Sequence, residues 1–153
     1  MSDASVTVRP AKPTDATPWL EMRRELWPDE DQVLLATDVD KYFGGKEPML
    51  HEVLLAFDAS GRAVGFAELN IRQYAEGCDT DRIAYLEGWF VAADARRMGV
   101  GASLIRTAEA WGRLQGCTEF ASDALLENEI SAAAHGALGF AEVERIRCFR
   151  KAL

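Results

Sequence analysis

One stretch of this 153-residue sequence limits the possible folds more than any other: an apolar run that leads through two glycines into an amphipathic helix. Residues 85–91 are mostly apolar and are bounded by turn-forming residues, which predicts a buried strand. Gly99 and Gly101 follow the strand. Beyond them, apolar side chains recur at helical spacing at Val100, Leu104, Ile105, Ala108 and Trp111. This spacing predicts a helix with one buried face, and the order strand, glycine turn, helix indicates an α/β domain.

The glycine turn has the pattern Arg96-x-x-Gly99-x-Gly101 at the start of the predicted helix. Because positions 99 and 101 lack side chains, a ligand can approach the backbone there. The unpaired amides of the first helical turn then attract an anion such as a phosphate. A simple tight turn contains the same two glycines, so the pattern alone does not decide. The Walker and dinucleotide-binding patterns are excluded, because the residues after Gly101 are Ala, Ser and Leu.

Composition and charge narrow the class of protein. The hydrophobic content of 48% and the charged content of 27% are ordinary for a globular protein, and the length suits one domain over residues 1–153. The net charge of −8 argues against nucleic-acid binding, which needs a basic face. An acidic cleft attracts cationic small molecules, although surplus carboxylates also simply keep a protein in solution. No run suits a membrane span, and the first residues lack the pattern of a signal peptide.

The three cysteines, Cys78, Cys117 and Cys148, are odd in number and lack the spacing of metal ligands. We therefore expect them to fill the core, and we expect no metal site. Free thiols are typical of a reducing compartment, so the cytoplasm is the simplest location.

The remaining segments predict the rest of a mixed sheet with flanking helices. The predicted strands lie at residues 6–10, 51–58, 63–72, 85–91, 119–123 and, as one or two strands, 140–151. The predicted helices lie between residues 14 and 28, at 34–43, after Gly101, and at 128–138. A hairpin turn is expected at residues 59–62 and a polar loop at 74–82. Strands come first as hairpins and then alternate with helices, which is typical of a single α/β domain with a mixed sheet.

Four features in this order resemble the GCN5-related N-acetyltransferase (GNAT) superfamily. They are Arg9-Pro10 with the helix that follows, the hairpin at 51–72, the loop at 96–101, and Asn128 with His135, Gly139 and Phe140. The resemblance covers nearly the whole chain. It implies a single-domain GNAT fold of the α/β (α+β) class, in which a mixed central sheet is splayed around acetyl-CoA and flanked by helices.

Shorter stretches look like the aminoglycoside 6'-N-acetyltransferases of Gram-negative bacteria. They are residues 25–28, 77–79, 86–88, 121–123, 127–128, 130–131, 139–140 and 144–145. This narrower resemblance implies direct transfer of acetyl from acetyl-CoA to the 6'-amine of an aminoglycoside in a ternary complex. Antibiotic resistance and a homodimer are implied as well. Two alternatives stay open: a GNAT enzyme for another substrate (a polyamine, an amino acid or a protein N-terminus), and an acetyl-CoA-binding sensor without turnover.

The resemblance also implies which residues hold acetyl-CoA. The strand residues Trp89, Phe90 and Val91 would offer backbone N–H groups to the thioester oxygen and the pantetheine arm. The pyrophosphate would be bound by the amides of Arg97, Met98, Gly99, Val100 and Gly101. Arg96 either pairs with a phosphate or is solvated. Asn128 is expected to bind the cofactor arm, to cap a helix, or to do both.

Three residues are candidates for the chemistry itself. An amine must lose a proton before it attacks, and Glu87 or Asp123 is expected to take it, directly or through water. Asp123 is also the better candidate for holding a cationic amine; otherwise both are surface carboxylates. His135 stands where many GNAT enzymes have a tyrosine proposed to protonate the coenzyme A thiolate. Histidine can donate a proton near neutral pH, so it either keeps this role or is a helix-surface residue.

Three further residues are expected to contact the antibiotic. Tyr74 and Trp27 would stack on or border a sugar ring, although Trp27 is equally a core residue at a helix end. Glu144 is expected to bind a more distant ring, an expectation that comes only from the narrower resemblance.

Overall fold

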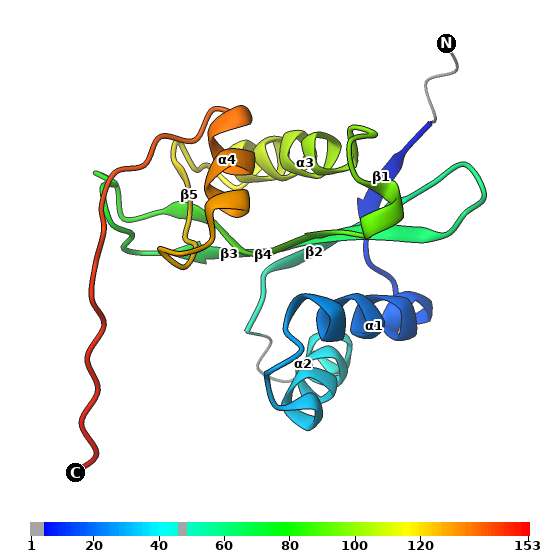
Figure 1. The fold of residues 1–153 in the computed structure, drawn as a ribbon, viewed down its shortest axis with the longest axis horizontal. Helices are drawn as coiled ribbons and strands as arrows, with labels where there is room; N and C mark the ends of the chain where they lie inside the picture. Colours follow the sequence, from blue (N-terminus) through cyan, green and yellow to red (C-terminus); the bar gives the residue numbers. More distant parts are fainter. Residues whose placement is uncertain (1–4, 46–48) are drawn as a thin grey trace.

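The computed structural model describes residues 5–45 and 49–153 and shows a five-stranded sheet between two layers of helices (Figure 1). The strands are β1 (Thr7–Pro10), β2 (Glu52–Phe57), β3 (Ala63–Arg72), β4 (Ile83–Val91) and β5 (Phe120–Ser122). They lie side by side in chain order. Only β4 and β5 are parallel, which the long crossover through a helix makes possible. The expected mixed sheet is confirmed.

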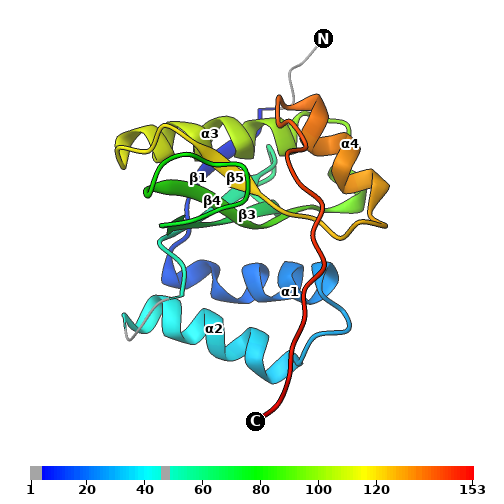
Figure 2. The ribbon, with the colours of Figure 1, turned by 90° about the vertical axis from the view of Figure 1, so that its left-hand side faces the viewer.

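Each face of the sheet is covered by helices (Figure 2). On one face lie α1 (Ala16–Leu26), preceded by the short 3₁₀ helix η1 (Pro13–Asp15), and α2 (Gln32–Gly44). On the other lie α3 (Val100–Leu114) and α4 (Glu129–Ala137), with the 3₁₀ helix η2 (Ala93–Ala95) before α3. Trp19 of α1 and Phe66 of β3 belong to the core on the first face. Leu104 and Ala108 of α3 belong to the core on the second face. The GNAT arrangement expected from the sequence is confirmed.

A buried ion pair ties the first helical layer to the sheet. Arg23 Nε of α1 donates to Glu68 Oε1 of β3 at 2.7 Å, and Trp19 Nε1 donates to the same oxygen at 3.0 Å. The Arg23 guanidinium also donates to the carbonyl oxygen of Leu35 in α2 at 2.7 Å. One buried side chain therefore links α1, α2 and β3.

The sheet opens between β4 and β5. Their pairing runs from Ala84 opposite Phe120 to Leu86 opposite Ser122 and then stops. In the part of the chain that the structure describes, residues 88–91 of β4 pair with β3 alone. The two parallel strands thus separate beyond Leu86, and the splayed sheet predicted from the resemblance is present.

Two predictions near the C-terminus are wrong. Residues 140–153 form neither helix nor strand. Phe140 and Val143 still contact the body of the protein, and the segment then extends away from it (Figures 1 and 2). Alternation of apolar and charged residues shows that a segment can pair, but no strand among the described residues pairs with it. Phe149 is 92% exposed, and Cys148 is also exposed rather than in the core, whereas Cys117 is buried as predicted. No helix in the described parts of the chain is long and apolar enough to cross a membrane.

Candidate functional site

The glycine turn leaves its backbone open. Gly99 has a φ of 77° and caps α3, and Arg97 before it also lies in the left-handed region, at a φ of 63°. No atom would lie within 4 Å of a Cβ at Gly99, so its outer side faces free space. Since the first amides of a helix have no intrahelical acceptor, this end of α3 presents donors to an anion. The turn therefore has open backbone at the start of α3, and its binding of an anion stays a prediction.

The side chains of the loop are mostly exposed. Arg96, Arg97 and Met98 face solvent, and Arg96 Nε donates to the Val91 carbonyl oxygen at 3.1 Å, which fixes the loop to the end of β4. Val100 is buried and belongs to the core between α3 and the sheet.

The strand residues before the loop alternate across the sheet. Phe90 packs on the α1 side, where its ring stacks on Phe66 at 5.8 Å. Trp89 lies on the opposite side, close to Gly101, whose Cβ would come within 3.1 Å of the indole. Trp89 Nε1 is buried and has no hydrogen-bond partner within the described residues.

Glu87 projects into a cavity because β4 has a bulge there. Gly88 lies opposite Glu68 and Leu86 lies opposite Leu69, so Glu87 is the extra residue between them. A bulge redirects one side chain and is frequent beside active sites. The cavity has a volume of about 320 Å³ and lies between β3, β4 and helices α1 and α2, where Glu87, Glu68 and Asp38 line it.

Glu87 and Asp123 are joined by two intervening side chains. Arg72 donates to both carboxylate oxygens of Glu87, at 2.9 and 2.7 Å. The Arg72 guanidinium also lies over the Tyr85 ring, 3.6 Å from its centre, and the Tyr85 hydroxyl donates to Asp123 Oδ2. We call Arg72, Tyr85, Glu87 and Asp123 the acidic row. The structure therefore brings the two predicted carboxylates into one connected group at the opening of the sheet.

The contacts within the acidic row shift the pKa of its other two members. Burial, with the hydrogen bond to Asp123, raises the pKa of the Tyr85 hydroxyl, so it remains a donor. The hydrogen bonds to Glu87 raise the pKa of Arg72, which stays a cation. Glu87 thus acts within an ion pair, while Asp123 is exposed and keeps lone pairs for another donor.

His135 lies in the last turn of α4, on the other side of the opening. Its Nδ1 is 2.7 Å from the Ser131 carbonyl oxygen, and its Nε2 is 2.8 Å from Ser122 Oγ at the end of β5. Ser122 and Asp123 are consecutive and point to opposite faces, the first toward His135 and the second toward Tyr85. His135 therefore contacts the opening through Ser122, and is not simply a helix-surface residue.

The remaining predicted residues are placed less centrally. Asn128 caps α4, because its Oδ1 accepts from the Ser131 amide at 3.0 Å. Trp27 packs against Gly88 beside Glu87: a Cβ on Gly88 would lie 2.7 Å from its indole. Tyr74 is 70% exposed, and Glu144 lies in the exposed C-terminal segment. No hydrogen bond or ion pair joins either of these two to the acidic row among residues 5–45 and 49–153.

The sequence did not single out Arg72, Tyr85 or Ser122. Arg72 is the last residue of β3, a largely apolar strand. A charged residue at the end of an apolar strand was the one sequence signal that could have pointed to it. Ser122 lies between Ala121 and Asp123 in a stretch that already drew attention for its aspartate. The contacts that give these residues a role join distant parts of the chain, and spacing alone does not reveal them.

Comparisons with known proteins agree with this arrangement. The acetyltransferase (GNAT) family matches residues 17–140. The chain is 50% identical over 151 residues to an aminoglycoside N(6')-acetyltransferase type 1 of Klebsiella aerogenes, with 99% of each chain covered. It is 39% identical to a protein of the same description from Stenotrophomonas maltophilia, covering 100% of this chain and 97% of the relative.

Solved structures show the same similarity. One is AAC(6')-Iy in complex with the bisubstrate analogue CoA-S-monomethyl-acetylneamine, with a TM-score of 0.88 and 35% identity over 97% of this chain and 99% of that chain. Another is the aminoglycoside 6'-N-acetyltransferase AAC(6')-Ih of Acinetobacter baumannii, with a TM-score of 0.87 and 37% identity over 97% and 99% of the two chains.

Proposed function

The chain belongs to the acetyltransferase (GNAT) family, and from this premise we propose that it is an aminoglycoside 6'-N-acetyltransferase. It transfers the acetyl group of acetyl-CoA directly to the 6'-amine of an aminoglycoside within a ternary complex, and so confers resistance to the antibiotic. One observation carries the proposal: the opening between β4 and β5 has an anion-binding glycine turn at one end and two carboxylates at the other. The first suits a pyrophosphate and the second suits a cationic amine.

The loop and the end of β4 bind acetyl-CoA in this proposal. The amides of residues 97–101 bind the pyrophosphate, with Arg96 beside them, and backbone N–H groups of residues 89–91 face the thioester and pantetheine. Two features of the structure fit such a ligand: the open space at Gly99 and the unpaired buried donor Trp89 Nε1. Asn128 keeps its side-chain N–H₂ group for the cofactor arm, because only its oxygen caps α4.

The acidic row binds the amine. Asp123 holds the substrate ammonium group, because it is exposed and has lone pairs beyond the one that Tyr85 uses. Glu87 takes the proton that the amine must lose before attack, directly or through water. Trp27, beside Gly88, borders the sugar ring. Tyr74 and Glu144 complete the binding of the more distant rings.

A panel of amines tests the proposed function. Purified protein with acetyl-CoA is assayed for thiol release with tobramycin, kanamycin, spermidine, free amino acids and a peptide with a free N-terminus. We expect turnover with the two antibiotics and little with the others. Preference for spermidine, an amino acid or the peptide would assign the chain to another GNAT activity. Binding of acetyl-CoA without turnover of any amine would assign it to a sensor.

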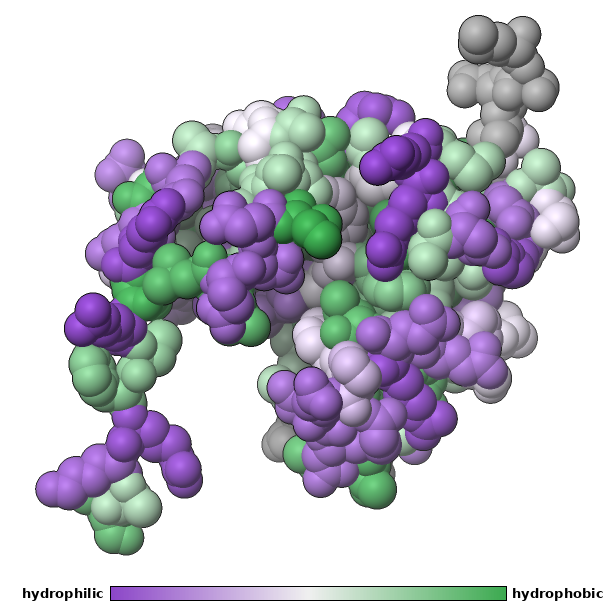
Figure 3. All heavy atoms as spheres, in the orientation of Figure 1, coloured by the Kyte–Doolittle hydropathy of each residue, from purple (hydrophilic) through white to green (hydrophobic). Residues whose placement is uncertain are grey.

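We also infer that the protein is a homodimer. Beyond its contacts at Phe140 and Val143, the segment 140–153 leaves the body in an extended form. Hydrophobic and hydrophilic residues are intermixed in it, and the apolar Val143, Ile146 and Phe149 are exposed (Figure 3). Among the described residues, β5 is an edge strand that pairs with β4 alone. An open strand edge together with an extended apolar segment favours pairing with another chain. A second copy of the chain has both an open β5 edge and a free C-terminal segment. We therefore expect the C-terminal segment of each copy to cover the sheet of the other copy.

The cytoplasm is the location we propose. All three cysteines are free thiols in the structure, as suits a reducing compartment, and acetyl-CoA is available there.

A further inference from the structure

His135 has no ring nitrogen left for direct contact with a leaving sulfur. Its Nδ1 faces the Ser131 carbonyl oxygen at 2.7 Å, and a carbonyl oxygen can only accept, so Nδ1 carries a hydrogen. In the neutral ring Nε2 is then the acceptor, and it accepts from the Ser122 hydroxyl at 2.8 Å. If His135 supplies a proton to the opening, the proton passes through Ser122.

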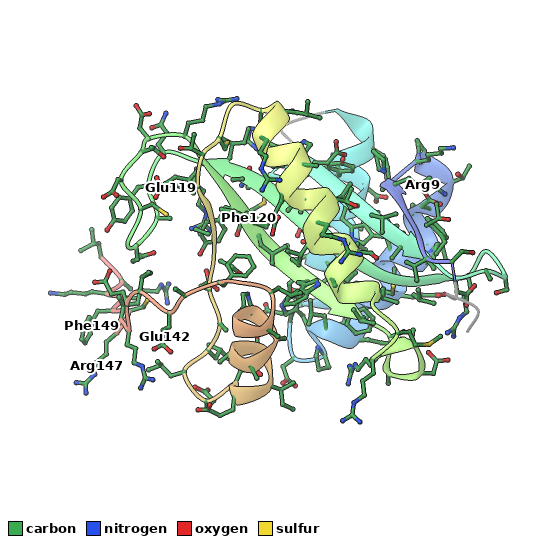
Figure 4. The ribbon with its side chains drawn as sticks, turned by 90° about the horizontal axis from the view of Figure 1, so that it is seen from above. Arg9, Glu119, Phe120, Glu142, Arg147 and Phe149 are labelled. Atoms are coloured by element: carbon green, nitrogen blue, oxygen red, sulfur yellow. The ribbon has the colours of Figure 1, made fainter. Side chains whose placement is uncertain are left out.

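Aromatic packing holds the imidazole in this orientation. Trp89 meets the ring edge-on with centroids 5.3 Å apart, and Phe140 does the same at 5.1 Å. Phe140 also packs against Phe120 of β5, which Figure 4 labels, and both rings belong to the core on the α3 side of the sheet. Turning the ring to free Nε2 would break both hydrogen bonds and this packing. The partner of Nε2 is therefore fixed by the fold.

Ser122 lies at the apex of the opening. It is the last residue of β5 to pair with β4, opposite Leu86, and its Oγ is 3.4 Å from the Leu86 carbonyl oxygen. Beyond this pair the strands separate. The Ser122 hydroxyl therefore lies where the two strands separate, and His135 lies behind it.

Within the proposed acetyltransferase activity, on which this inference rests, we propose that Ser122 is a further catalytic residue. Its hydroxyl carries a proton from His135 to the sulfur that leaves the acetyl group. When the carbon–sulfur bond breaks, its electron pair stays on the sulfur and Ser122 gives the sulfur its hydroxyl proton. His135 enters the step protonated on both nitrogens and gives its Nε2 proton to Ser122 Oγ.

The step balances without any other reactant. The sulfur ends as a thiol, Ser122 ends as a hydroxyl, and His135 ends as the neutral ring with its hydrogen on Nδ1, where it faces the Ser131 carbonyl oxygen. His135 is half-buried, so solvent can return the proton before the next turnover. Both partners of the charged ring, the Ser131 carbonyl and the Ser122 oxygen, can accept the two hydrogen bonds that this form donates.

Kinetics of Ser122 variants test the role in turnover. For Ser122→Ala we expect kcat to fall by about a hundredfold or more, with the KM values for both substrates little changed. Ser122→Thr keeps a hydroxyl and should restore most of kcat. Ser60→Ala, the same change in the exposed β2–β3 turn, is the matched control. Because the two residues act in one step, Ser122→Ala combined with His135→Gln should lower kcat no further than the more severe single variant.

Nitrogen NMR of the imidazole tests the pair without any substrate. The chain has 2 histidines, so His51→Asn identifies the signals of His135. In the neutral ring we expect the proton on Nδ1 and a hydrogen-bonded acceptor at Nε2. Ser122→Ala should shift the Nε2 signal and Ser122→Thr should shift it back.

Each outcome decides one point. An Nε2–H tautomer, or a kcat that Ser122→Ala leaves unchanged in an active enzyme, would overturn the proposal. Acetylated Ser122, found by mass spectrometry after incubation with acetyl-CoA, would overturn it in favour of a nucleophile. Wild-type protein that turns over no amine would refute the proposed function, while the NMR result would still report on the Ser122–His135 pair.

Discussion

At the scale of single residues, Asp123 is the carboxylate best placed to hold a substrate cation. A charge-assisted hydrogen bond contributes roughly 1.5–3 kcal/mol, and 1.4 kcal/mol corresponds to a factor of ten. Asp123→Asn should therefore lower kcat/KM for an aminoglycoside about tenfold to a hundredfold and leave the KM for acetyl-CoA unchanged. Steady-state kinetics with both substrates varied measure this.

The control is Asp94→Asn, which removes an exposed carboxylate paired with Arg62, outside the acidic row. We expect it to behave as wild type. If both Asp123→Asn and Glu87→Gln keep the wild-type kcat/KM for every aminoglycoside tested, the amine is bound elsewhere.

The identity of these residues was predictable from the sequence, but their surroundings were not. Glu87 and Asp123 were expected beside the opening because they lie at the ends of predicted strands. That Arg72 pairs with Glu87 depends on the register of two antiparallel strands and on a one-residue bulge. Hydrophobic patterning does not reveal this bulge, because β4 has apolar side chains on both faces and the change of face after Glu87 therefore leaves no mark in the sequence.

A second prediction concerns the salt bridge between Arg9 of β1 and Asp15 of η1. Arg9 donates to both oxygens of Asp15, at 2.7 and 3.1 Å, and these hydrogen bonds lower the pKa of the buried Asp15 carboxyl. A lowered pKa in the folded state stabilises the protein above the unfolded pKa of about 4, and this contribution is lost as the pH falls through the folded value. Asp15→Asn should therefore cost about 1–2 kcal/mol at pH 7.

Denaturant unfolding across pH measures the difference. The gap between wild type and Asp15→Asn should shrink below about pH 4. The exposed Asp29→Asn should show no such gap. A gap that stays constant down to pH 2 would mean that the Arg9–Asp15 pair is not its source.

At the scale of elements, the turn between β4 and α3 carries the third prediction. Gly99→Ala puts a Cβ where no protein atom lies within 4 Å, so the new methyl group meets no other side chain. It strains the backbone, which has a φ of 77°, and it obstructs a ligand that approaches the turn. We expect the KM for acetyl-CoA to rise markedly while the fold is kept. Gly61→Ala is the matched control, because its φ is 84° and its surroundings are equally empty, but it lies in the β2–β3 turn.

Calorimetry of acetyl-CoA binding to the two variants, with their melting temperatures, separates strain from blocking. Both should lose about 1 kcal/mol of stability from the positive φ. Only Gly99→Ala should bind acetyl-CoA more weakly. Equal binding by the two variants would remove the turn from the cofactor site.

Elements whose signals are local were predicted well. The bounds of β3 are those expected, residues 63–72, because alternating apolar residues and the turn at 59–62 define them within one hairpin. The helix after Gly101 follows from its buried face in the same way. Residues 140–151 were predicted as strand and are not. Their alternation of apolar and charged residues indicates that the segment could pair with a strand. Pairing also needs a neighbouring strand edge, which the described part of the single chain does not offer to this segment.

At the scale of the whole molecule, the proposed dimer carries the fourth prediction. If the C-terminal segment packs against a second copy, Ile146→Asp and Phe149→Asp should shift the protein from dimer to monomer, because burying a carboxylate without a partner is unfavourable. Leu114→Asp, at an exposed position at the end of α3, should remain dimeric. Light scattering coupled to size-exclusion chromatography measures the mass. A wild-type monomer would contradict the proposal.

The most direct test of the central claim is the position of the acetyl group on the product. Neomycin and paromomycin differ only at the 6' position, which carries an amine in the first and a hydroxyl in the second. With acetyl-CoA and purified protein, NMR of the products should show neomycin acetylated on the 6'-nitrogen alone and paromomycin unmodified. Acetylation of paromomycin on another amine, or of neomycin at a different nitrogen, would contradict the account of this chain as a 6'-N-acetyltransferase.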